Sequence, residues 1–273
     1  MSDTARVAAV QMNSSADVDQ NLELAGRLLA EAAADGCVLA VLPENFAFMG
    51  TRGRDKLKHA EELGTGPIQE FLKATASEQQ LWIVSGSIPL KSSQADRCYG
   101  ATLVVDADGN TKSCYRKIHL FDVDLPDRDE SYRESASMSP GDELVVQDSP
   151  AGCLGLSICY DLRFPELYRK LTEMGAVVLS VPAAFTLVTG QAHWHTLLRA
   201  RAIENLAYVI APGQYGQHSD GRKTFGHSMI IDPWGRILAE SAEGDYVVTA
   251  DLDLELPHKL RREFPTLKHR VFK

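Results

Sequence analysis

The chain has 273 residues, of which 44% are hydrophobic and 24% charged, as in ordinary globular proteins. Its formal net charge of −9 argues against a general nucleic-acid-binding protein, which needs a basic surface. Residues 1–12 contain only a short apolar run, so no signal peptide or membrane span is expected there, and five cysteines without a CxxC pair indicate free thiols in a reducing cytoplasm.

Strand and helix patterns alternate along the first half of the chain. Residues 6–12 predict a strand, and Asp17 is a typical N-cap for an amphipathic helix that stops at Gly36. The continuous apolar run at 37–44 fits a strand that is buried on both faces. Further elements are expected as a helix at 67–79, a strand at 81–88, and strands at 99–109 and 111–117 joined by a hairpin turn at Asp108-Gly109.

The second half repeats this alternation after a polar stretch. Residues 121–140 hold few hydrophobic and many charged side chains, which predicts a long loop of the kind that often carries function. The elements expected after it are a strand at 152–159, a helix from Pro165, a strand at 176–182, a helix at 191–207, a strand at 208–214, a hairpin within 226–241 and a strand at 246–254 before a basic tail. No repeat or domain boundary is visible, so we expect residues 1–273 to form a single α/β domain with helices outside the sheets.

Two side chains follow apolar strands at points where a sheet can present them for chemistry. Cys159 ends an apolar run, and a thiol at this junction lies at the carboxyl edge of a sheet, where open α/β folds bind ligands. Glu44 ends another run, and a carboxylate directly after a buried strand is unfavourable unless it is paired or functional. Taken alone, a structural cysteine and a solvated loop glutamate are the alternatives. Lys117 and Glu134, taken alone, are expected to be exposed surface charges.

Taken together, these segments show a family resemblance. LPEN, YRKIHLFD, YRESASMSPGD and ICYDLRFPEL stand in this order and resemble the four signature segments of the nitrilase superfamily of carbon–nitrogen hydrolases. The resemblance continues through TGQAHWHTLLRARAIEN and FGHSMIIDPWG and spans about Val7 to Arg270. Four ordered motifs with compatible spacing are a specific signal, whereas any one of them alone is weak.

The resemblance implies a fold and a catalytic set. The fold is an α/β four-layer αββα sandwich, and it implies a homodimer whose subunits pack helix layer to helix layer. The family's Glu–Lys–Cys triad falls on Glu44, Lys117 and Cys159, and its second glutamate falls on Glu134, which supports the lysine. In this chemistry the glutamate takes the thiol proton and the cysteine forms a thioester with the substrate. Lys117 and the backbone N–H of Tyr160 stabilise the oxyanion, and Lys117 is also expected to favour the thiolate.

Arg163, four residues after the nucleophile, is a candidate for substrate recognition. Its planar fork of donors suits a substrate carboxylate. The alternative is an ion pair with one of three acids, Asp161, Glu166 and Glu134.

Two further patterns concern ligands. Phe185, Thr186 and Thr189 resemble the pocket-lining loop of the family, and a helix-capping turn is their alternative. His193 and His195 resemble a metal-binding pair, but residues two apart on a helix do not share a face, and no third ligand is close in sequence. We therefore expect neither a metal nor another cofactor.

The resemblance also suggests the substrate. ICYDLRFPEL, RARAIEN and FGHSMIIDPWG most resemble the deaminated-glutathione amidases, which hydrolyse the amide that joins a 2-oxoglutarate moiety to Cys-Gly. The YRES and SPGD segments also resemble ω-amidase, which acts on 2-oxoglutaramate. A nitrilase, an N-carbamoyl amidohydrolase and a non-enzymatic binding protein are further alternatives. The expected partners are thus a small amide and a second copy of the chain, rather than nucleic acid or a membrane.

Overall fold

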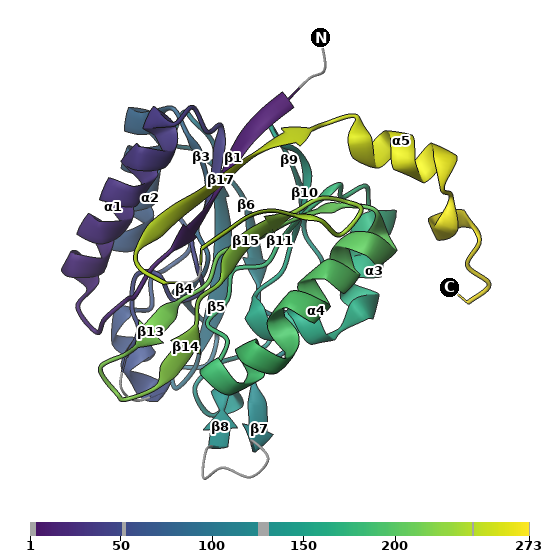
Figure 1. The fold of residues 1–273 in the computed structure, drawn as a ribbon. Coiled ribbons are helices and arrows are strands. Elements are labelled where there is room, and N and C mark those ends of the chain that lie inside the picture. Colours follow the sequence, from purple (N-terminus) through teal and green to yellow (C-terminus); the bar gives the residue numbers. More distant parts are fainter. Residues whose placement is uncertain (1–3, 51–52, 125–130, 242, 273) are drawn as a thin grey trace.

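Two large β-sheets stack against one another in the computed structural model, which describes residues 4–50, 53–124, 131–241 and 243–272 (Figure 1). The first sheet runs in the order β17 (Tyr246–Asp253), β1 (Thr4–Gln11), β2 (Leu39–Val41), β3 (Trp82–Val84), β5 (Cys98–Val105) and β4 (Ile88–Lys91), with β6 (Thr111–Arg116) beside β5. The second runs in the order β16 (Ile237–Ser241), β15 (Ser228–Ile231), β12 (Tyr208–Ala211), β11 (Val178–Ser180), β10 (Gly152–Leu156) and β9 (Val146–Ser149). Two small hairpins pair β7 (Asp122–Asp124) with β8 (Ser131–Arg133) and β13 (Tyr215–Gln217) with β14 (Lys223–Phe225).

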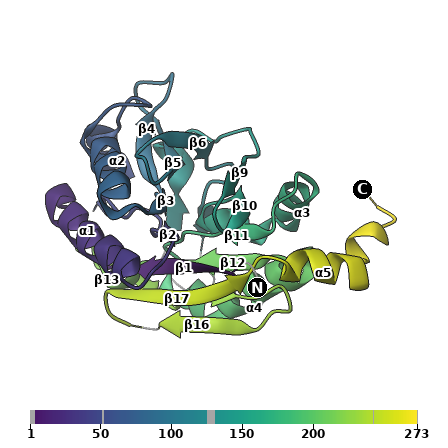
Figure 2. The ribbon, with the colours of Figure 1, turned by 90° about the horizontal axis from the view of Figure 1, so that it is seen from above.

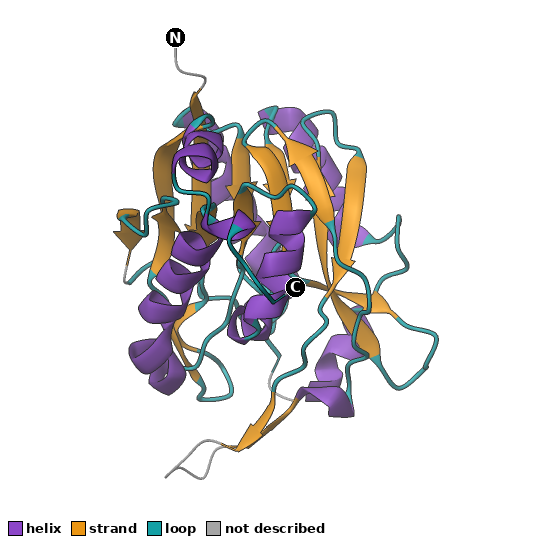
Figure 3. Ribbon diagram, turned by 90° about the vertical axis from the view of Figure 1, so that its right-hand side faces the viewer, coloured by secondary structure: helices purple, strands orange, loops and turns teal. Residues whose placement is uncertain are grey.

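Helices cover the outer faces of both sheets, as Figures 2 and 3 show. The first sheet carries α1 (Val18–Ala34) and α2 (Pro67–Gln79), and the second carries α3 (Pro165–Glu173) and α4 (Leu187–Asn205). The remaining helical segments are α5 (Leu256–Glu263) and the 3-10 turns η1 (Gly53–His59), η2 (Glu134–Ala136), η3 (Cys159–Arg163) and η4 (Thr266–Lys268). The layers therefore follow the αββα order that the sequence resemblance implied. Among the described residues, no helix combines the length and apolarity that a membrane span requires.

Strand β1 is apolar over most of its length because both of its faces are buried. Val7 and Ala9 lie in the core between the two sheets, whereas Ala8 and Val10 pack beneath Leu29 of α1. Successive side chains of a strand point to opposite faces, so a strand that is covered on both sides must be apolar throughout. Each fully buried valine or leucine side chain stabilises the fold by roughly 1.5–3 kcal/mol.

Several sequence predictions hold in detail. The Asp17 side chain caps α1 by accepting a hydrogen bond from the backbone N–H of Gln20 at 3.1 Å. Helix α2 has the predicted limits, and β5 turns into β6 at Asp108-Gly109, where Gly109 takes a φ of 81°.

Other predictions were wrong in extent. The expected loop at 121–140 contains the β7–β8 hairpin and η2, although its residues 125–130 lie outside the described part of the chain. The single strand expected at 81–88 is broken into β3 and β4, because Gly86 has a φ of 62° and a Cβ there would meet the Pro43 carbonyl. Helix α4 begins at Leu187 rather than at residue 191, and the basic tail contains α5.

The strand order places the reactive side chains near one another. β1, β2 and β3 are parallel in the first sheet, and β10, β11 and β12 are parallel in the second. Glu44 follows β2, Lys117 follows β6 directly, and Cys159 follows β10. All three line a single pocket at this end of the stacked sheets.

Candidate active site

A buried lysine lies between two carboxylates at the base of the pocket. The Nζ atom of Lys117 is 2.8 Å from Oε1 of Glu44 and 2.9 Å from Oε2 of Glu134, and the lysine is only 2% exposed. The second oxygen of Glu44 accepts a hydrogen bond from the backbone N–H of Ala184 at 3.0 Å. Glu134 also accepts one from the backbone N–H of Phe121 at 2.7 Å. Every charge in this buried group is thus paired and hydrogen-bonded, as buried ions require.

These pairings keep two of the groups ionised. Burial lowers the pKa of Lys117, but the charges of Glu134 and Glu44 outweigh that effect and raise the pKa well above its ordinary value. Burial likewise raises the pKa of Glu134, but Lys117 outweighs it and the pKa is lowered. Lys117 is therefore an ammonium, and Glu134 a carboxylate, at neutral pH. A fixed ammonium in a site that excludes water can stabilise negative charge that develops during a reaction.

The candidate nucleophile lies on a strained turn. Cys159 is buried, begins η3 and has a φ of 49°, a left-handed conformation that residues other than glycine seldom adopt. Its backbone N–H donates to the carbonyl of Pro182 at 2.8 Å. Asn45, directly after Glu44, has a φ of 59°. At Cys159 such a conformation is unfavourable by about 1–3 kcal/mol, whereas asparagine tolerates it, and conformations of this kind cluster at functional sites.

Asp161 holds this turn in place. Its buried carboxylate accepts hydrogen bonds from the Tyr115 hydroxyl at 2.7 Å, from the backbone N–H of Ile158 at 2.8 Å and from that of His119 at 3.1 Å. The sequence suggested Asp161 only as an ion-pair partner of Arg163, because no local pattern reveals contacts across 42 or 46 residues. In the structure, Asp161 fixes the backbone of the turn that carries Cys159.

The thiol of Cys159 is neutral in the free protein. Burial, together with the charge of Glu44, raises the pKa of Cys159 well above its ordinary value, and Lys117 opposes this without outweighing it. As expected, Lys117 by itself lowers the pKa of Cys159 and so favours the thiolate. Burial and Glu44 outweigh it, so the net effect on this pKa is a rise. A neutral thiol must lose its proton during attack, so it needs the base that Glu44 can provide by hydrogen bonding to it.

We expect this protonation state to be visible by absorbance. The difference at 240 nm between the wild-type protein and Cys159→Ser should stay flat up to about pH 8.5, the ordinary midpoint of a thiol, and rise only at higher pH. The other thiols cancel in this difference. A thiolate signal that is lost with Cys159 at pH 7 would contradict a neutral resting thiol.

The pocket has a volume of about 500 Å³. It collects every candidate site residue of the sequence analysis, namely Glu44, Lys117, Glu134, Cys159, Tyr160, Arg163, Phe185, Thr186 and Thr189. It also contains cations that the sequence did not single out, and these are Lys56, Arg133, Arg222 and Lys223. Arg133 lies within the YRESASMSPGD segment, on β8. No motif marks the other three, because they reach the pocket from η1 and the β13–β14 hairpin only in the folded chain.

Arg163 faces aromatic rings rather than an acid. Its guanidinium carbon lies 5.1 Å from the ring centre of Phe185 and 5.8 Å from that of Tyr160, and Nη1 is 3.1 Å from Nδ1 of His193. Among the described residues, no carboxylate lies within ion-pair distance of it. The ion pair that was the alternative for Arg163 is therefore absent from that part of the structure, and its donors can face a ligand.

The loop after β11 serves both the helix and the pocket. Thr186 is the N-cap of α4 and accepts a hydrogen bond from the backbone N–H of Thr189 at 3.3 Å, which explains why the helix starts earlier than predicted. Phe185 packs on Trp194 at 4.9 Å between ring centres. The capping turn that was the alternative for these threonines is thus present, and both also line the pocket.

The two histidines that resembled a metal pair have different neighbours. His193 contacts Arg163, whereas Nε2 of His195 lies 2.8 Å from Oε1 of Glu240 on β16. They do not form a pair with one another. His195 instead meets two residues that are distant in sequence.

Comparison with known proteins identifies the family. A sequence model of the carbon–nitrogen hydrolase family matches residues 6–262, nearly the whole chain. The chain belongs to the carbon–nitrogen hydrolase family. It is accordingly a hydrolase that acts on carbon–nitrogen bonds, as the ordered motifs predicted.

Relatives of this carbon–nitrogen hydrolase carry one recurring name. A protein of Synechocystis sp. that is named deaminated glutathione amidase is 44% identical over 97% of both chains. The protein of the same name from Yersinia enterocolitica is 39% identical over 98% of this chain and 93% of its own. That from Homo sapiens is 40% identical over 97% of this chain and 81% of its own.

Solved structures confirm the predicted nitrilase-type sandwich. The Caenorhabditis elegans NitFhit protein superposes with a TM-score of 0.92 at 38% identity and covers 99% of this chain and 66% of its own. Saccharomyces cerevisiae Nit3, a member of branch 10 of the nitrilase superfamily, superposes with a TM-score of 0.88 at 33% identity, over 99% and 97% of the two chains.

Proposed function

We propose that this hydrolase is a cysteine amidase that cleaves deaminated glutathione to 2-oxoglutarate and Cys-Gly. The observation that carries the chemistry is the buried Lys117 held between Glu44 and Glu134 beside Cys159. The relatives named deaminated glutathione amidase, at 39–44% identity over nearly the full chain, support the substrate. The pocket has a volume of about 500 Å³, an ordinary size for a small-molecule site.

Each side chain has a role in the first half of the reaction. Glu44 takes the proton of the Cys159 thiol while the sulfur attacks the amide carbon, and the negative charge moves to the carbonyl oxygen. Lys117 and the backbone N–H of Tyr160 stabilise this oxyanion. When it collapses, the C–N bond breaks, Glu44 returns its proton to the leaving amine, and Cys-Gly departs. A thioester between the 2-oxoglutaryl group and the sulfur remains.

The second half regenerates the thiol. Glu44 takes a proton from water, the hydroxide adds to the thioester carbon, and the same donors stabilise the second oxyanion. The C–S bond then breaks, 2-oxoglutarate leaves as the acid, and the sulfur recovers its proton from Glu44. Glu134 stays ionised throughout and positions Lys117, as its short contacts to Nζ and its lowered pKa suggest.

The substrate carries a carboxylate at each end, and the pocket offers cations for both. The chain as a whole has a net charge of −9, so an anion is repelled at long range and needs local positive charge. We assign Arg163 to the carboxylate of the 2-oxo acid, with Phe185, Thr186 and Thr189 lining the acyl side. Lys56 and Lys223 lie in the same pocket and provide positive charge for the carboxylate of the dipeptide, whereas Arg222 is paired there with Asp220.

Arg163→Lys is expected to raise KM for 2-oxo acid amides by roughly 10- to 150-fold. This is the affinity equivalent of the 1.5–3 kcal/mol that a hydrogen bond to a charged group contributes, and a lysine cannot reproduce the planar fork. Arg163→Ala should lose at least as much. Steady-state kinetics on deaminated glutathione and on a neutral amide of similar length measure the effect. KM for the neutral amide should hardly change.

A matched control is Arg116→Lys, because Arg116 stacks on Tyr99 and does not line the pocket. Arg116→Lys should leave KM unchanged for both substrates. Equal losses on charged and neutral amides in Arg163→Lys would show that Arg163 is structural. That outcome would remove the main physical reason for a 2-oxo acid substrate.

The second candidate is an ω-amidase that acts on 2-oxoglutaramate, because that amide has the same acyl end for Arg163. The two differ only at the leaving group, which is Cys-Gly or ammonia. We expect kcat/KM to be highest for deaminated glutathione in a side-by-side panel with 2-oxoglutaramate, an N-carbamoyl amino acid and a simple nitrile. A clear preference for any of the other three would replace the proposed substrate.

We also infer that residues 1–273 form a single domain that assembles as a homodimer in the cytoplasm. The shared core between the sheets supports one domain, and five free cysteines support a reducing compartment. Met174 after α3, Ile203 on α4 and Trp234 in the β15–β16 turn are 47%, 47% and 51% exposed, and exposed apolar side chains of this kind favour burial against a second copy. Sedimentation equilibrium should give twice the mass of the chain, whereas a stable monomer at micromolar concentration would contradict the dimer.

A further inference from the structure

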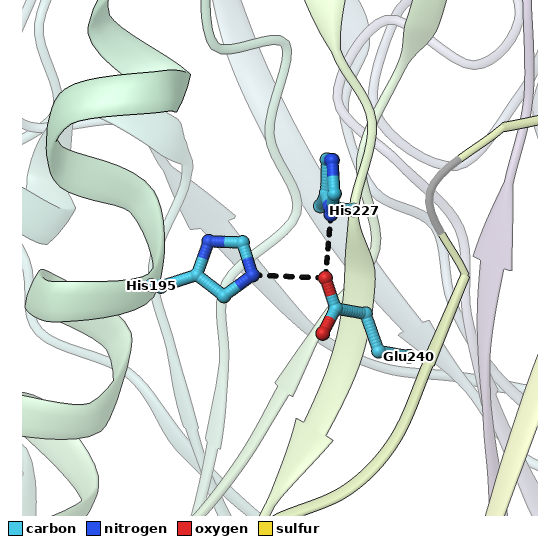
Figure 4. A group of neighbouring side chains, drawn as sticks. All are labelled: His195, His227 and Glu240. Atoms are coloured by element: carbon cyan, nitrogen blue, oxygen red, sulfur yellow. Dashed lines mark hydrogen bonds and ion pairs between the residues drawn. The ribbon is translucent and has the colours of Figure 1, made fainter.

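Three side chains from separate elements meet at the carboxylate of Glu240 (Figure 4). His195 comes from α4, His227 directly precedes β15, and Glu240 lies on β16. Oε1 of Glu240 is 2.8 Å from Nε2 of His195 and 2.5 Å from Nδ1 of His227. The three donor atoms all lie within 4.8 Å of one another, and none of the three residues lines the pocket.

The donor set matches a known coordination chemistry. Two imidazole nitrogens and one carboxylate oxygen are ligands that Zn²⁺ accepts, and three protein ligands leave a fourth position for water. The side chains of His195, His227 and Glu240 are 37%, 28% and 27% exposed, so an ion can reach them from solvent. We propose that His195, His227 and Glu240 bind one Zn²⁺ ion at a site that is separate from the catalytic pocket.

An ion would require all three side chains to adjust, since their donor atoms lie within 4.8 Å of one another. Ligand atoms around a tetrahedral Zn²⁺ lie about 3.3 Å apart, given bonds of about 2.0–2.2 Å. The two contacts of Glu240 are shorter than this, because its oxygen accepts hydrogen bonds from both rings. Its carboxylate therefore has to withdraw by roughly 0.5–1 Å, which rotation of a half-exposed glutamate side chain allows.

The backbone at His227 is held in a conformation that aims its ring at this point. His227 has a φ of 55°, its carbonyl accepts a hydrogen bond from Nε1 of Trp194 at 2.8 Å, and its ring stacks on Phe225 with 4.2 Å between centres. The backbone N–H of Phe225 in turn donates to the carbonyl of Phe185 in the pocket wall at 3.0 Å. A bound ion would tie α4 to β15 and β16 and brace this wall. Its role is structural, because the amide chemistry uses a thiol, a carboxylate and an ammonium.

Zn²⁺ binding by equilibrium dialysis tests the site directly. The protein is used as Cys159→Ser, so that the pocket thiol cannot capture the metal, and is stripped with a chelator before Zn²⁺ is added. We expect one ion per chain. Loss of a group that supports a metal ligand lowers affinity about 10- to 100-fold, so removal of a ligand itself should lower it at least about 10-fold.

The variants separate ligand loss from misfolding. His195→Ala and Glu240→Gln each remove one ligand, and His227→Asn removes the ring while asparagine tolerates the positive φ. His258→Ala is the matched control, because this exposed histidine of α5 lies outside the cluster. All three ligand variants should bind Zn²⁺ at least about 10-fold more weakly, with the control unchanged.

Two results would overturn the proposal. These are an absence of stoichiometric binding by Cys159→Ser, or binding that is unchanged in folded His195→Ala and Glu240→Gln, with folding checked by circular dichroism. In addition, chelated wild-type protein should keep its amidase activity when a reducing agent is present. A loss of activity on chelation that Zn²⁺ restores equally in wild-type protein and in folded His195→Ala would place the ion outside this cluster.

Discussion

Cys159→Ala is expected to abolish turnover and to leave the fold intact. The loss should be on the order of 10⁶-fold in kcat, the scale seen when the nucleophile of a hydrolase triad is removed. The reason is that no thioester can form without the sulfur, whereas removal of one small side chain at the pocket surface exposes no new core. Steady-state kinetics with a circular dichroism spectrum of each variant measures both parts.

The remaining cysteines provide the matched controls. Burial raises the pKa of Cys37 to about 11 and also raises the pKa values of Cys98, Cys114 and Cys153, so none of these thiols is activated. None of them lines the pocket. Their alanine variants should keep near-normal kcat. Full activity in Cys159→Ala, or its loss in a folded Cys153→Ala, would contradict the assignment of the nucleophile.

Glu44→Gln should lower kcat by at least about 10²- to 10⁴-fold, the usual contribution of general acid–base catalysis. Glutamine keeps the shape and an acceptor for Ala184 or Lys117, but it cannot take the proton of a neutral thiol. Because the raised pKa of Cys159 leaves the thiol protonated, no preformed thiolate can replace the missing base. Single-turnover and steady-state rates should fall together.

Glu134→Gln is the matched variant, since both glutamates contact the same Nζ atom of Lys117. It should stay folded and bind substrate with a similar KM, but turn over slowly. The reason is that Lys117 loses its orientation, while the reaction keeps Glu44 as its base. Near-normal kcat in Glu44→Gln would show that the base is another group.

The sequence predicted which side chains gather in the pocket better than it predicted the contacts around them. Glu44, Lys117, Glu134 and Cys159 stand in ordered motifs, and a residue after a strand is placed by the strand itself. The left-handed turn at Cys159, with a φ of 49°, has no such signal, because distant segments hold it, as in the hydrogen bonds from the Cys159 N–H to Pro182 and from Tyr115 to Asp161.

The same limit explains the errors in the fold. Alternating apolar runs predicted most strands and helices, since burial on both faces leaves a pattern in the chain. The break between β3 and β4 depends on the approach of the Pro43 carbonyl to Gly86, which lies 43 residues further along. The partners of His195 likewise lie 32 and 45 residues away, at His227 and Glu240. Contacts of this kind depend on the tertiary arrangement and not on local pattern.

The most direct test is to trap the covalent intermediate. Wild-type protein is mixed with excess deaminated glutathione, quenched with acid within the first turnovers, and examined by intact mass and by peptide mapping. We predict an adduct with the mass of a 2-oxoglutaryl group on Cys159, which is absent from Cys159→Ser and is released as 2-oxoglutarate when the pH is restored. Rapid turnover without any adduct on Cys159, or an adduct on a different residue, would contradict the thioester mechanism.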